Sequence, residues 1–307
     1  MTLQQLEYIV ALDDTRHFVR AAGECGVAQP TLSAMIRKLE EELGAAIFDR
    51  SRHPVEPTPL GSRLIRQARA VLSDMKRMEE MVSAETGTLS GPLSVGVIPT
   101  VAPYLIPQFI RLFRAGYPDI KPTVHEMITC DITSALESGT LDAGMLATPL
   151  GSSELLEIPL YYEKFAAYFP PDATVPDEPL SAGTLPSEGL WILREGHCMR
   201  SQIFNFCNRR PLQDGIYEAG SIDTLIRTVD ANGGYTVIPE LHLRFLSDQQ
   251  LRGIRPIDSP PAVREISLVI RRDFVRERML NAVADTVKRI IPEHMLDSRL
   301  KKYSIRL

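Results

Sequence analysis

A cysteine with polar and cationic neighbours is the residue of this chain best suited to chemistry. Cys198 follows His197 and lies two positions before Arg200, whose guanidinium carries a permanent positive charge. Apolar side chains then recur at the spacing of an amphipathic helix, at Met199, Ile203, Phe206 and Cys207. Cys198 would lie in the first turn of that helix, where the dipole and the unpaired N–H groups favour a thiolate. We therefore expect Cys198 to be a reactive nucleophile.

The second cysteine of this segment, Cys207, lies nine positions beyond Cys198. On one continuous helix this separation corresponds to roughly 13 Å between the two Cα atoms. A disulfide requires its two Cα atoms to lie within about 7 Å of each other. If the two cysteines pair, the helix between them must unwind and its packed face must move. Oxidation would then act as a conformational switch.

Two other interpretations of the cysteine segment are open on spacing alone. Free cysteine is among the most buried residue types, so two cysteines on one apolar helix commonly belong to a core. A metal site that uses His197, Cys198 and Cys207 is less favoured, because the close-set ligand pairs of zinc modules are missing. We therefore expect neither a metal nor a cofactor.

The composition is that of a soluble globular protein. The 307 residues allow two or three domains, and 44% hydrophobic and 24% charged residues are ordinary proportions. No apolar run approaches the roughly 18 residues of a membrane span, and the N-terminus lacks the features of a secretory signal. With four cysteines and no signal, we expect a cytoplasmic protein whose disulfides are transient. The net charge of −5 does not indicate nucleic-acid binding, so any such indication must be local.

The N-terminal residues have the pattern of a helix-turn-helix. A helical pattern runs from Leu3 to Ala22 and is broken at Gly26, and a second helix is expected from Gln29 to Gly44. Two short helices joined by a glycine-containing turn are the outline of a DNA reader whose second helix enters the major groove. An ordinary helical pair is the alternative, and the equal numbers of acidic and basic residues in 1–70 do not decide between them.

Polar side chains near the start of the second helix lie off its apolar face, where they would reach base edges or phosphates. These candidate DNA contacts are Gln29, Thr31, Ser33 and Arg37, with Pro30 at the helix start. Arg50 and Arg52 precede residues 54–58, which resemble a β-hairpin wing, and are expected to contact the DNA backbone.

The residues of this region match a known family pattern. The matching stretches are Phe18-x-x-Ala21-Ala22, Gln29-Pro30-Thr31-Leu32-Ser33, Ile36-x-x-Leu39-Glu40-x-x-Leu43-Gly44, Phe48-x-Arg50 and Thr58-x-x-Gly61. This pattern resembles the winged helix-turn-helix of LysR-type transcriptional regulators, which implies that double-stranded DNA is a partner. Two positions depart from it. Ala28 stands where a serine is usual, which removes an N-cap hydroxyl, and Met35 stands where a polar residue is usual.

From Leu60 onward the chain is predicted to form one long helix. Apolar residues at alternating spacings of four and three form a heptad seam, at Leu64, Ala68, Val71, Met75, Met78 and Val82. Such a seam favours pairing with a second helix, and the alternative is a helix that lies against its own domain. The family resemblance also implies a dimer, because LysR-type regulators dimerise through a linker helix. Residues 86–92 contain the breaking residues of a hinge.

Beyond the hinge, strand and helix patterns alternate, which predicts a parallel sheet with right-handed crossovers. In the first lobe we expect strands at Leu93–Ile98, Pro122–Glu126 and Leu141–Ala147 and helices at Pro103–Ala115 and Asp131–Glu137. The chain then crosses near Pro159–Phe169 into a second lobe with Leu190–Leu193, the cysteine helix, Gly215–Ala219, Ser221–Ala231 and Tyr235–Pro239. Glu265–Ile270 and Val275–Ile291 are expected to return to the first lobe. Such a unit would bind its ligand in the cleft between the lobes.

The predicted fold is an N-terminal all-α winged helix-turn-helix with a long linker helix, followed by a two-lobed α/β effector domain. That effector domain resembles the periplasmic-binding-protein-like domain of the LysR family. The expected boundaries are residues 1–59 for the DNA-binding domain, 60–87 for the linker helix and hinge, and 88–307 for the effector domain. Within it, the first lobe comprises about 88–163 and 268–307, and the second lobe about 164–267.

The cysteine segment and parts of the first lobe narrow the resemblance. The matching stretches are Gly196-His197-Cys198-Met199-Arg200-x-Gln202, Phe206-Cys207, Ile98-Pro99-Thr100-Val101-x-Pro103-Tyr104-Leu105 and His125-Glu126-x-x-Thr129. They resemble the peroxide-sensing members of the LysR family. The resemblance implies that Cys198 is the peroxide-reactive thiolate and that Cys207 is its resolving partner.

The same resemblance implies a peroxide-binding set around the sulfur. Thr100 and Thr129 would supply hydroxyls that place peroxide in the cleft, and His197 and Arg200 would lie beside Cys198. Without the resemblance, helix capping after strands is the preferred role for both threonines. Peroxide cleavage needs a thiolate, donors that orient the two oxygens, and a proton for the departing hydroxide.

Two positions depart from the peroxide-sensing pattern, and two cysteines remain outside it. Ser201 occupies a usually acidic position, and Ile216 lies where close relatives have a histidine. Cys25 is expected to pack between the helices of the DNA reader. Cys130, next to Thr129, is a less favoured competitor for the role of resolving thiol.

The predicted function is a DNA-binding transcriptional activator that senses hydrogen peroxide through Cys198 and Cys207 and activates oxidative-stress defence genes. It would act as a homodimer or homotetramer with RNA polymerase as a further partner. One alternative is a LysR-type regulator gated by a small organic effector in the cleft between the lobes. The other is an enzyme, a thiol peroxidase, which would not need the N-terminal DNA reader. We therefore expect no enzymatic activity.

Overall fold

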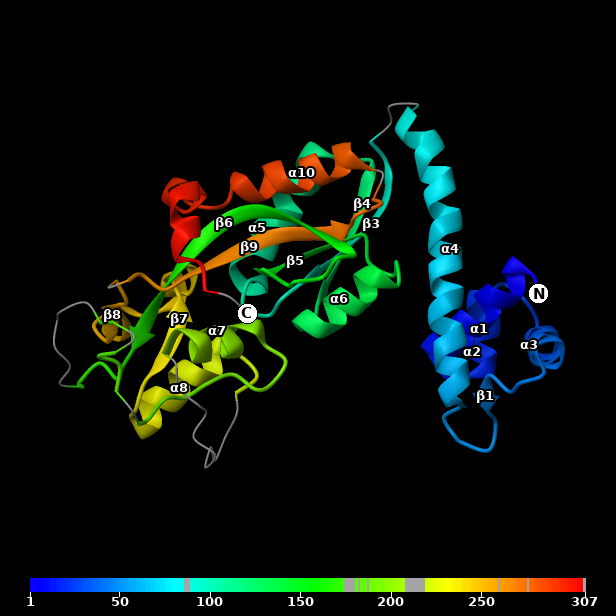
Figure 1. The fold of residues 1–307 in the computed structure, drawn as a ribbon, viewed down its shortest axis with the longest axis horizontal. Helices are drawn as coiled ribbons and strands as arrows, with labels where there is room; N and C mark the ends of the chain where they lie inside the picture. Colours follow the sequence, from blue (N-terminus) through cyan, green and yellow to red (C-terminus); the bar gives the residue numbers. More distant parts are fainter. Residues whose placement is uncertain are drawn as a thin grey trace. The chain divides into compact units, whose positions relative to one another are not determined.

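The chain divides into two compact units, one of Met1–Thr88 with Glu137–Thr140 and the other of Leu89–Leu136 with Leu141–Leu307. Figure 1 shows the computed structural model and the labels of its helices and strands. The structure describes residues 1–85, 89–173, 180–181, 183–186, 188–207, 219–258, 260–274 and 276–305. Within helices it does not describe the side chains of residues 76, 77, 79–85 and 207.

The first unit begins with two helices where one was predicted. Helix α1 spans Leu3–Thr15 and helix α2 spans Phe18–Glu24. Arg16 ends α1 with a left-handed backbone, at φ 54°, and the His17 side chain then caps α2 by accepting a hydrogen bond from Val19 N. The prediction of a continuous helical run is therefore wrong, because apolar spacing does not reveal a one-residue turn.

The predicted helix-turn-helix and wing are both present. Helix α3 spans Gln29–Leu43 and ends at Gly44, whose φ of 66° is the left-handed conformation that glycine adopts at helix ends. Its N-terminus has no side-chain cap, as expected from Ala28. The wing consists of β1 (Phe48–Asp49) and β2 (Glu56–Pro57), which pair antiparallel.

Helix α4 spans Pro59–Glu85 and belongs to two environments along its length. Ala68 of the predicted seam is buried in the core of the first unit, and Leu64 packs against the same core. Further along, Val71, Met75 and Met78 are 37%, 36% and 68% exposed. The seam therefore begins as part of the DNA reader's own core and continues as an exposed apolar stripe. The side chain of Val82 lies outside the described residues.

The second unit is built on a seven-stranded sheet with the order β4-β3-β5-β9-β6-β7, in which β8 also pairs with β6. The strands are β3 (Gly91–Val97), β4 (Ile120–Glu126), β5 (Ala143–Thr148), β6 (Leu155–Tyr168), β7 (Thr236–Pro239), β8 (Ile254–Pro256) and β9 (Val263–Arg271). Strand β3 is parallel to β4 and β5, but β9 is antiparallel to β5 and β6. The predicted parallel sheet of the first lobe is confirmed for β3, β4 and β5, but β9, which returns from the second lobe alongside β6, runs antiparallel to its neighbours.

Helices cover this sheet (Figure 1). They are α5 (Ala102–Gly116), α6 (Thr129–Glu137), α7 (Cys198–Cys207), α8 (Ile222–Asn232), α9 (Asp248–Leu251) and α10 (Glu277–Lys288), with 3₁₀ turns η1 (Glu240–Phe245), η2 (Glu293–Leu296) and η3 (Ser298–Tyr303). The predicted strand Leu190–Leu193 forms only isolated bridges to Tyr235 and Ala219. Of the predicted strand Gly215–Ala219, only Ala219 lies within the described residues.

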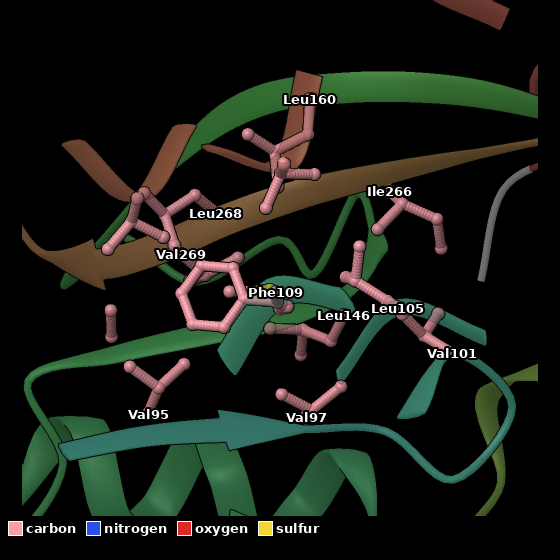
Figure 2. Close-up of a cluster of buried hydrophobic side chains, with 14 of the residues drawn as sticks. Val95, Val97, Val101, Leu105, Phe109, Leu146, Leu160, Ile266, Leu268 and Val269 are labelled. Atoms are coloured by element: carbon pink, nitrogen blue, oxygen red, sulfur yellow. The ribbon is translucent and has the colours of Figure 1, made fainter. Parts of the chain in front are cut away.

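The second unit contains two buried clusters. Figure 2 shows part of the first, in which Val95 and Val97 of β3 and Leu268 and Val269 of β9 surround Phe109 of α5. The second cluster lies around β7, α7 and α8 and includes Phe165, Met199, Ile203, Leu225 and Ile238. The long strand β6 contributes to both clusters, whereas β9 contributes to the first. These two cores are the physical basis of the two lobes, whose predicted boundaries stay a prediction.

Candidate redox site

Helix α7 begins at Cys198, at the junction of the two lobes. The Cys198 side chain packs into the first cluster, whereas the next residue, Met199, is fully buried in the second. Gly196 makes this position possible, because its φ is 94° and a Cβ there would lie 2.9 Å from Ile128 Cδ1. The start of α7 is therefore seated closely on the residues that lead into α6.

The environment of the Cys198 thiol both opposes and supports ionisation. Burial raises the pKa of the thiol, and this effect is the largest. The positive charge of Arg264 lowers the pKa, as do hydrogen bonds from the Thr129 side chain and from the backbone of Ala147 and Met199. Burial outweighs the other effects, so the pKa of the thiol is raised, whereas the helix start alone would lower it.

Arg264 on β9 is the cation that acts on the thiol, and the sequence analysis missed it. Its side chain is fully buried. Nη1 donates to Thr100 Oγ1 at 2.9 Å, and Nη2 donates to the Thr100 carbonyl at 3.0 Å and to Tyr104 Oη at 2.6 Å. Nε donates to Glu163 Oε2 at 2.8 Å. No sequence motif surrounds Arg264, and its place becomes visible only when β9 lies beside β6.

The counter-charge of Arg264 comes from the facing strand. Glu163 of β6 is the register partner of Arg264 and is also fully buried, with 2.7 Å between Arg264 Nη2 and Glu163 Oε2. The other carboxylate oxygen accepts a hydrogen bond from Leu241 N at 2.8 Å. Burial opposes the charge on Arg264, but Glu163 and the polar groups beside it raise the Arg264 pKa, so the guanidinium stays protonated.

Polar atoms near Cys198 have hydrogen-bonding capacity that the described residues leave unused. His197 Nε2 is buried without a partner, as are both side-chain amide atoms of Gln202, one helical turn after Cys198. The Thr129 hydroxyl has no described partner other than the thiol. Because an unsatisfied buried polar group costs about 1–3 kcal/mol, this arrangement suits a small polar molecule. Burial and Arg194 lower the pKa of His197, so its imidazole is neutral at pH 7.

The structure places some of the predicted peroxide-binding residues near Cys198 and gives Arg200 other contacts. Thr129 and Thr100 lie around Cys198 and Arg264, as described above. Arg200 is partly buried, its guanidinium lies 5.5 Å from the centre of the Phe204 ring, and Nη1 donates to the Leu193 carbonyl at 3.2 Å. A role for Arg200 beside the sulfur stays a prediction.

Helix α7 runs without a break from Cys198 to Cys207. At 1.5 Å per residue its ends are separated by roughly 13 Å, so a disulfide between them requires this helix to unwind. The side chain of Cys207 and residue Ile216 lie outside what the structure describes. Of the other cysteines, Cys25 packs against the core of the first unit, as predicted, and Cys130 is exposed beside Thr129.

Most of the predicted DNA contacts on α3 are exposed. Gln29, Pro30, Thr31 and Arg37 are exposed and Ser33 is partly buried. A shallow hollow of about 330 Å³ on α3 is lined by Gln29, Pro30, Ser33, Ala34, Arg37, Lys38 and Glu41.

The two wing arginines differ in what holds them. Arg50 is partly buried, with Nη2 donating to Glu40 Oε2 at 2.8 Å and its guanidinium 5.7 Å from the centre of the Phe18 ring. Arg52 is exposed and pairs with Glu56 at 2.5 Å within the wing. Arg50 therefore stabilises the first unit as well as being a candidate DNA contact.

Two further classes of site were sought. In the part of the chain that the structure describes, no three His, Cys, Asp or Glu side chains are grouped so that they could hold a metal ion. No helix among those residues is long and apolar enough to cross a membrane.

A winged helix-turn-helix joined by a long helix to a two-lobed α/β unit with a buried cysteine defines a DNA-binding regulator that carries its own sensing domain. The chain belongs to the LysR family. Residues 3–62 match the bacterial regulatory helix-turn-helix protein of the lysR family, and residues 86–291 match the LysR substrate binding domain.

The most similar relatives include named peroxide regulators. The hydrogen peroxide-inducible genes activator of Haemophilus influenzae is 36% identical over 299 residues, which cover 95% of this chain and 99% of the relative. The DNA-binding transcriptional dual regulator OxyR of Escherichia coli is 36% identical over 306 residues, which cover 98% and 99%.

Solved structures agree with these relatives. A full-length OxyR variant from Pseudomonas aeruginosa superposes with a TM-score of 0.78 at 32% identity, covering 94% of this chain and 98% of that one. A hydrogen-peroxide-bound OxyR mutant from Corynebacterium glutamicum gives a TM-score of 0.61 at 30% identity, covering 94% of each chain. The two-lobed fold is thus shared with OxyR structures.

Proposed function

We propose that this chain is a transcriptional activator that senses hydrogen peroxide through Cys198 and responds on DNA. The observation that carries the proposal is a buried cysteine at the start of α7, beside the Thr129 hydroxyl and under the charge of Arg264. The relatives named above are peroxide-inducible gene activators, which supports oxidative-stress defence genes as the targets. The chain would act in the cytoplasm.

In the proposed reaction, the Cys198 thiolate attacks one peroxide oxygen. The S–O bond forms, the O–O bond breaks, and the departing hydroxide takes a proton to leave as water. Arg264 stabilises the thiolate. Thr100 Oγ1 accepts a hydrogen bond from Arg264 Nη1, so its own proton is available to a peroxide oxygen. Neutral His197, which directly precedes Cys198 in the sequence, would exchange a proton with the leaving group.

The sulfenic acid then becomes a disulfide. The Cys207 thiol attacks the oxidised sulfur of Cys198, the S–S bond forms, and the sulfenic oxygen leaves as water after taking the thiol proton. Because α7 separates the two cysteines, the helix must unwind. Met199 and Ile203 would leave the second cluster, at a cost of about 1.5–3 kcal/mol each for a fully buried apolar side chain. Peroxide reduction supplies the driving force for this rearrangement.

The proposed effect of oxidation is a change in the relative positions of two DNA-binding domains in a dimer. The exposed apolar stripe of Val71, Met75 and Met78 on α4 supports a dimer, and assembly into a homotetramer is part of the proposal. A change in the effector unit would alter how two copies of α3 sit on successive half-sites. Contact with RNA polymerase completes the proposed activation.

Mass mapping of disulfides tests the proposal directly. Fully reduced protein is mixed with one equivalent of hydrogen peroxide for a few seconds, alkylated and digested. We expect a Cys198–Cys207 bridge that is absent without peroxide, and a trapped sulfenic acid at Cys198 in Cys207→Ser. Cys130→Ser is the matched control and should form the same bridge as the wild type. Free thiols at Cys198 in the treated wild type would refute the proposal.

A further inference from the structure

The carboxylate of Glu163, which faces Arg264, is held in one position by its hydrogen bonds. Glu163 and Arg264 are directly opposed on β6 and β9, and both side chains are 0% exposed. One carboxylate oxygen accepts from Arg264 Nε, and the other accepts from Leu241 N of η1. The Glu163 carboxylate is therefore bound at both oxygen atoms, by β9 and by η1, which fixes its orientation toward the guanidinium.

This carboxylate also determines where the charge of Arg264 points. With Nε and Nη2 beside Glu163, Nη1 is directed at the Thr100 hydroxyl, and Nη2 also donates to Tyr104 Oη. The other ionisable groups around Glu163 are Tyr104 on α5, Tyr161 on β6 and Glu240 on η1. None of these is a cation, so Arg264 is the only positive charge among the described groups that act on Glu163.

A buried ion pair is a poor device for stability alone. Removing two charges from water costs several kcal/mol per ion, and a well-packed apolar pair of similar volume is often as stable or more so. In this chain the Arg264 half of the pair acts on the Cys198 thiol, whose charge state would govern the reaction. A carboxylate there opposes part of the Arg264 field that would otherwise favour the thiolate.

We propose that Glu163 is a positioning residue of the peroxide reaction, which aims Arg264 at Thr100 and restrains the ionisation of Cys198. This inference rests on the proposed function and concerns its first step. In that step the thiol proton leaves, the S–O bond forms, the O–O bond breaks, and hydroxide departs as water. Glu163 lowers the resting thiolate fraction while keeping the hydrogen-bond donors of the site in place. It contacts neither the sulfur nor the peroxide.

Two substitutions separate the two parts of this role. Glu163→Gln removes the negative charge at almost constant volume. Glu163→Asp keeps the charge but shortens the side chain, which loosens the contact to Arg264 Nε. The matched control is Glu265→Gln, which removes the buried carboxylate next to Arg264 in the chain, one whose described contacts include Thr148, Ser267 and Tyr162.

The effect of the Glu163 charge on the ionisation of Cys198 is measured without peroxide. The thiolate absorbs near 240 nm, and the pH titration of each full-length variant is corrected by subtracting the same variant carrying Cys198→Ser. We expect the Cys198 midpoint to fall by about one pH unit in Glu163→Gln, because the field of Arg264 is then less opposed. Glu163→Asp and Glu265→Gln should keep the wild-type midpoint. A merely structural role of Glu163 would not move this midpoint.

The effect of Glu163 on the orientation of the Arg264 guanidinium is measured with peroxide. At a pH where Cys198 is fully ionised, we expect both Glu163 variants to react about tenfold more slowly than the wild type, because Arg264 is less firmly held at Thr100. A wild-type midpoint in Glu163→Gln, or an equal shift in Glu265→Gln, would overturn the inference. If Glu163→Gln does not fold, a wild-type plateau rate in Glu163→Asp would overturn it instead. If Cys198 of the wild type does not react with peroxide, the proposed function is overturned. The absorbance titration uses no peroxide, so it tests the role of Glu163 independently of that result.

Discussion

Arg264 holds Thr100 at two points, with Nη1 2.9 Å from the hydroxyl oxygen and Nη2 3.0 Å from the carbonyl oxygen. The two residues lie 164 positions apart in the sequence, one on β9 and the other between β3 and α5. This contact gives Thr100 more than a capping role. It fixes the hydroxyl oxygen relative to Arg264 and brings a buried positive charge next to Thr100.

Replacing Arg264 by lysine should slow the peroxide reaction at neutral pH by at least about tenfold. Lysine keeps the charge, but its single ammonium cannot donate to Thr100, Tyr104 and Glu163 in the planar geometry of a guanidinium. Rapid mixing followed by alkylation and mass spectrometry of the Cys198 peptide measures the rate. Arg276→Lys is the control, because Arg276 pairs with Asp142 elsewhere in the first lobe. An unchanged rate in Arg264→Lys would mean that charge alone is sufficient.

Cys198 should make the folded protein less stable at alkaline pH. Burial raises the pKa of this thiol, so above about pH 8.5, the ordinary pKa of cysteine, the unfolded chain loses a proton that the folded protein keeps. The free energy of unfolding should then fall with rising pH by up to about 1.4 kcal/mol per pH unit, until the folded thiol also ionises. Denaturant unfolding of the reduced wild type and of Cys198→Ser between pH 7 and pH 10 measures the difference. Parallel pH profiles would contradict the prediction.

A charge on the exposed stripe of α4 should break the proposed dimer. Met78 is 68% exposed in the single chain, and placing a carboxylate at an apolar helix pair is costly because it must be desolvated. We expect Met78→Asp to raise the dimer dissociation constant at least roughly tenfold, measured by sedimentation. Ser73→Asp is the control, because residue 73 lies on the opposite side of α4 from Val71 and Met75 at 100° per residue. Equal behaviour of the two variants would place the dimer contact elsewhere.

Substitutions at Arg37 and Arg50 of the first unit should separate DNA binding from stability. Arg37 is exposed on α3, so Arg37→Ala is expected to weaken DNA binding by about 1–3 kcal/mol without lowering the melting temperature. Arg50→Ala should also destabilise the fold by about 1 kcal/mol, because Glu40 loses its partner. Fluorescence anisotropy on a DNA fragment selected with the wild-type protein, together with thermal unfolding, measures both effects. Wild-type DNA affinity in Arg37→Ala would remove that residue from the interface.

The local pattern of apolar and helix-terminal residues was sufficient to predict most of the helices and strands. The recognition helix ending at Gly44, the start of α7 at Cys198 and the strands of the first lobe all follow from spacing and terminal residues. Local pattern failed where the outcome depended on a single backbone angle, as at Arg16, or on the direction of a returning chain, as at β9. Neither feature changes the apolar periodicity from which elements are predicted.

The sequence by itself determined the family and the helix that carries Cys198, and it predicted that residue as the reactive centre. Only the tertiary structure decided which charge acts on it. Arg264 and Glu163 lie in stretches that read as ordinary strands, and they meet because β6 and β9 pair in a register that places them opposite each other. The tertiary structure also decided that burial raises the pKa of the thiol, because desolvation depends on what covers a side chain rather than on its neighbours in the chain.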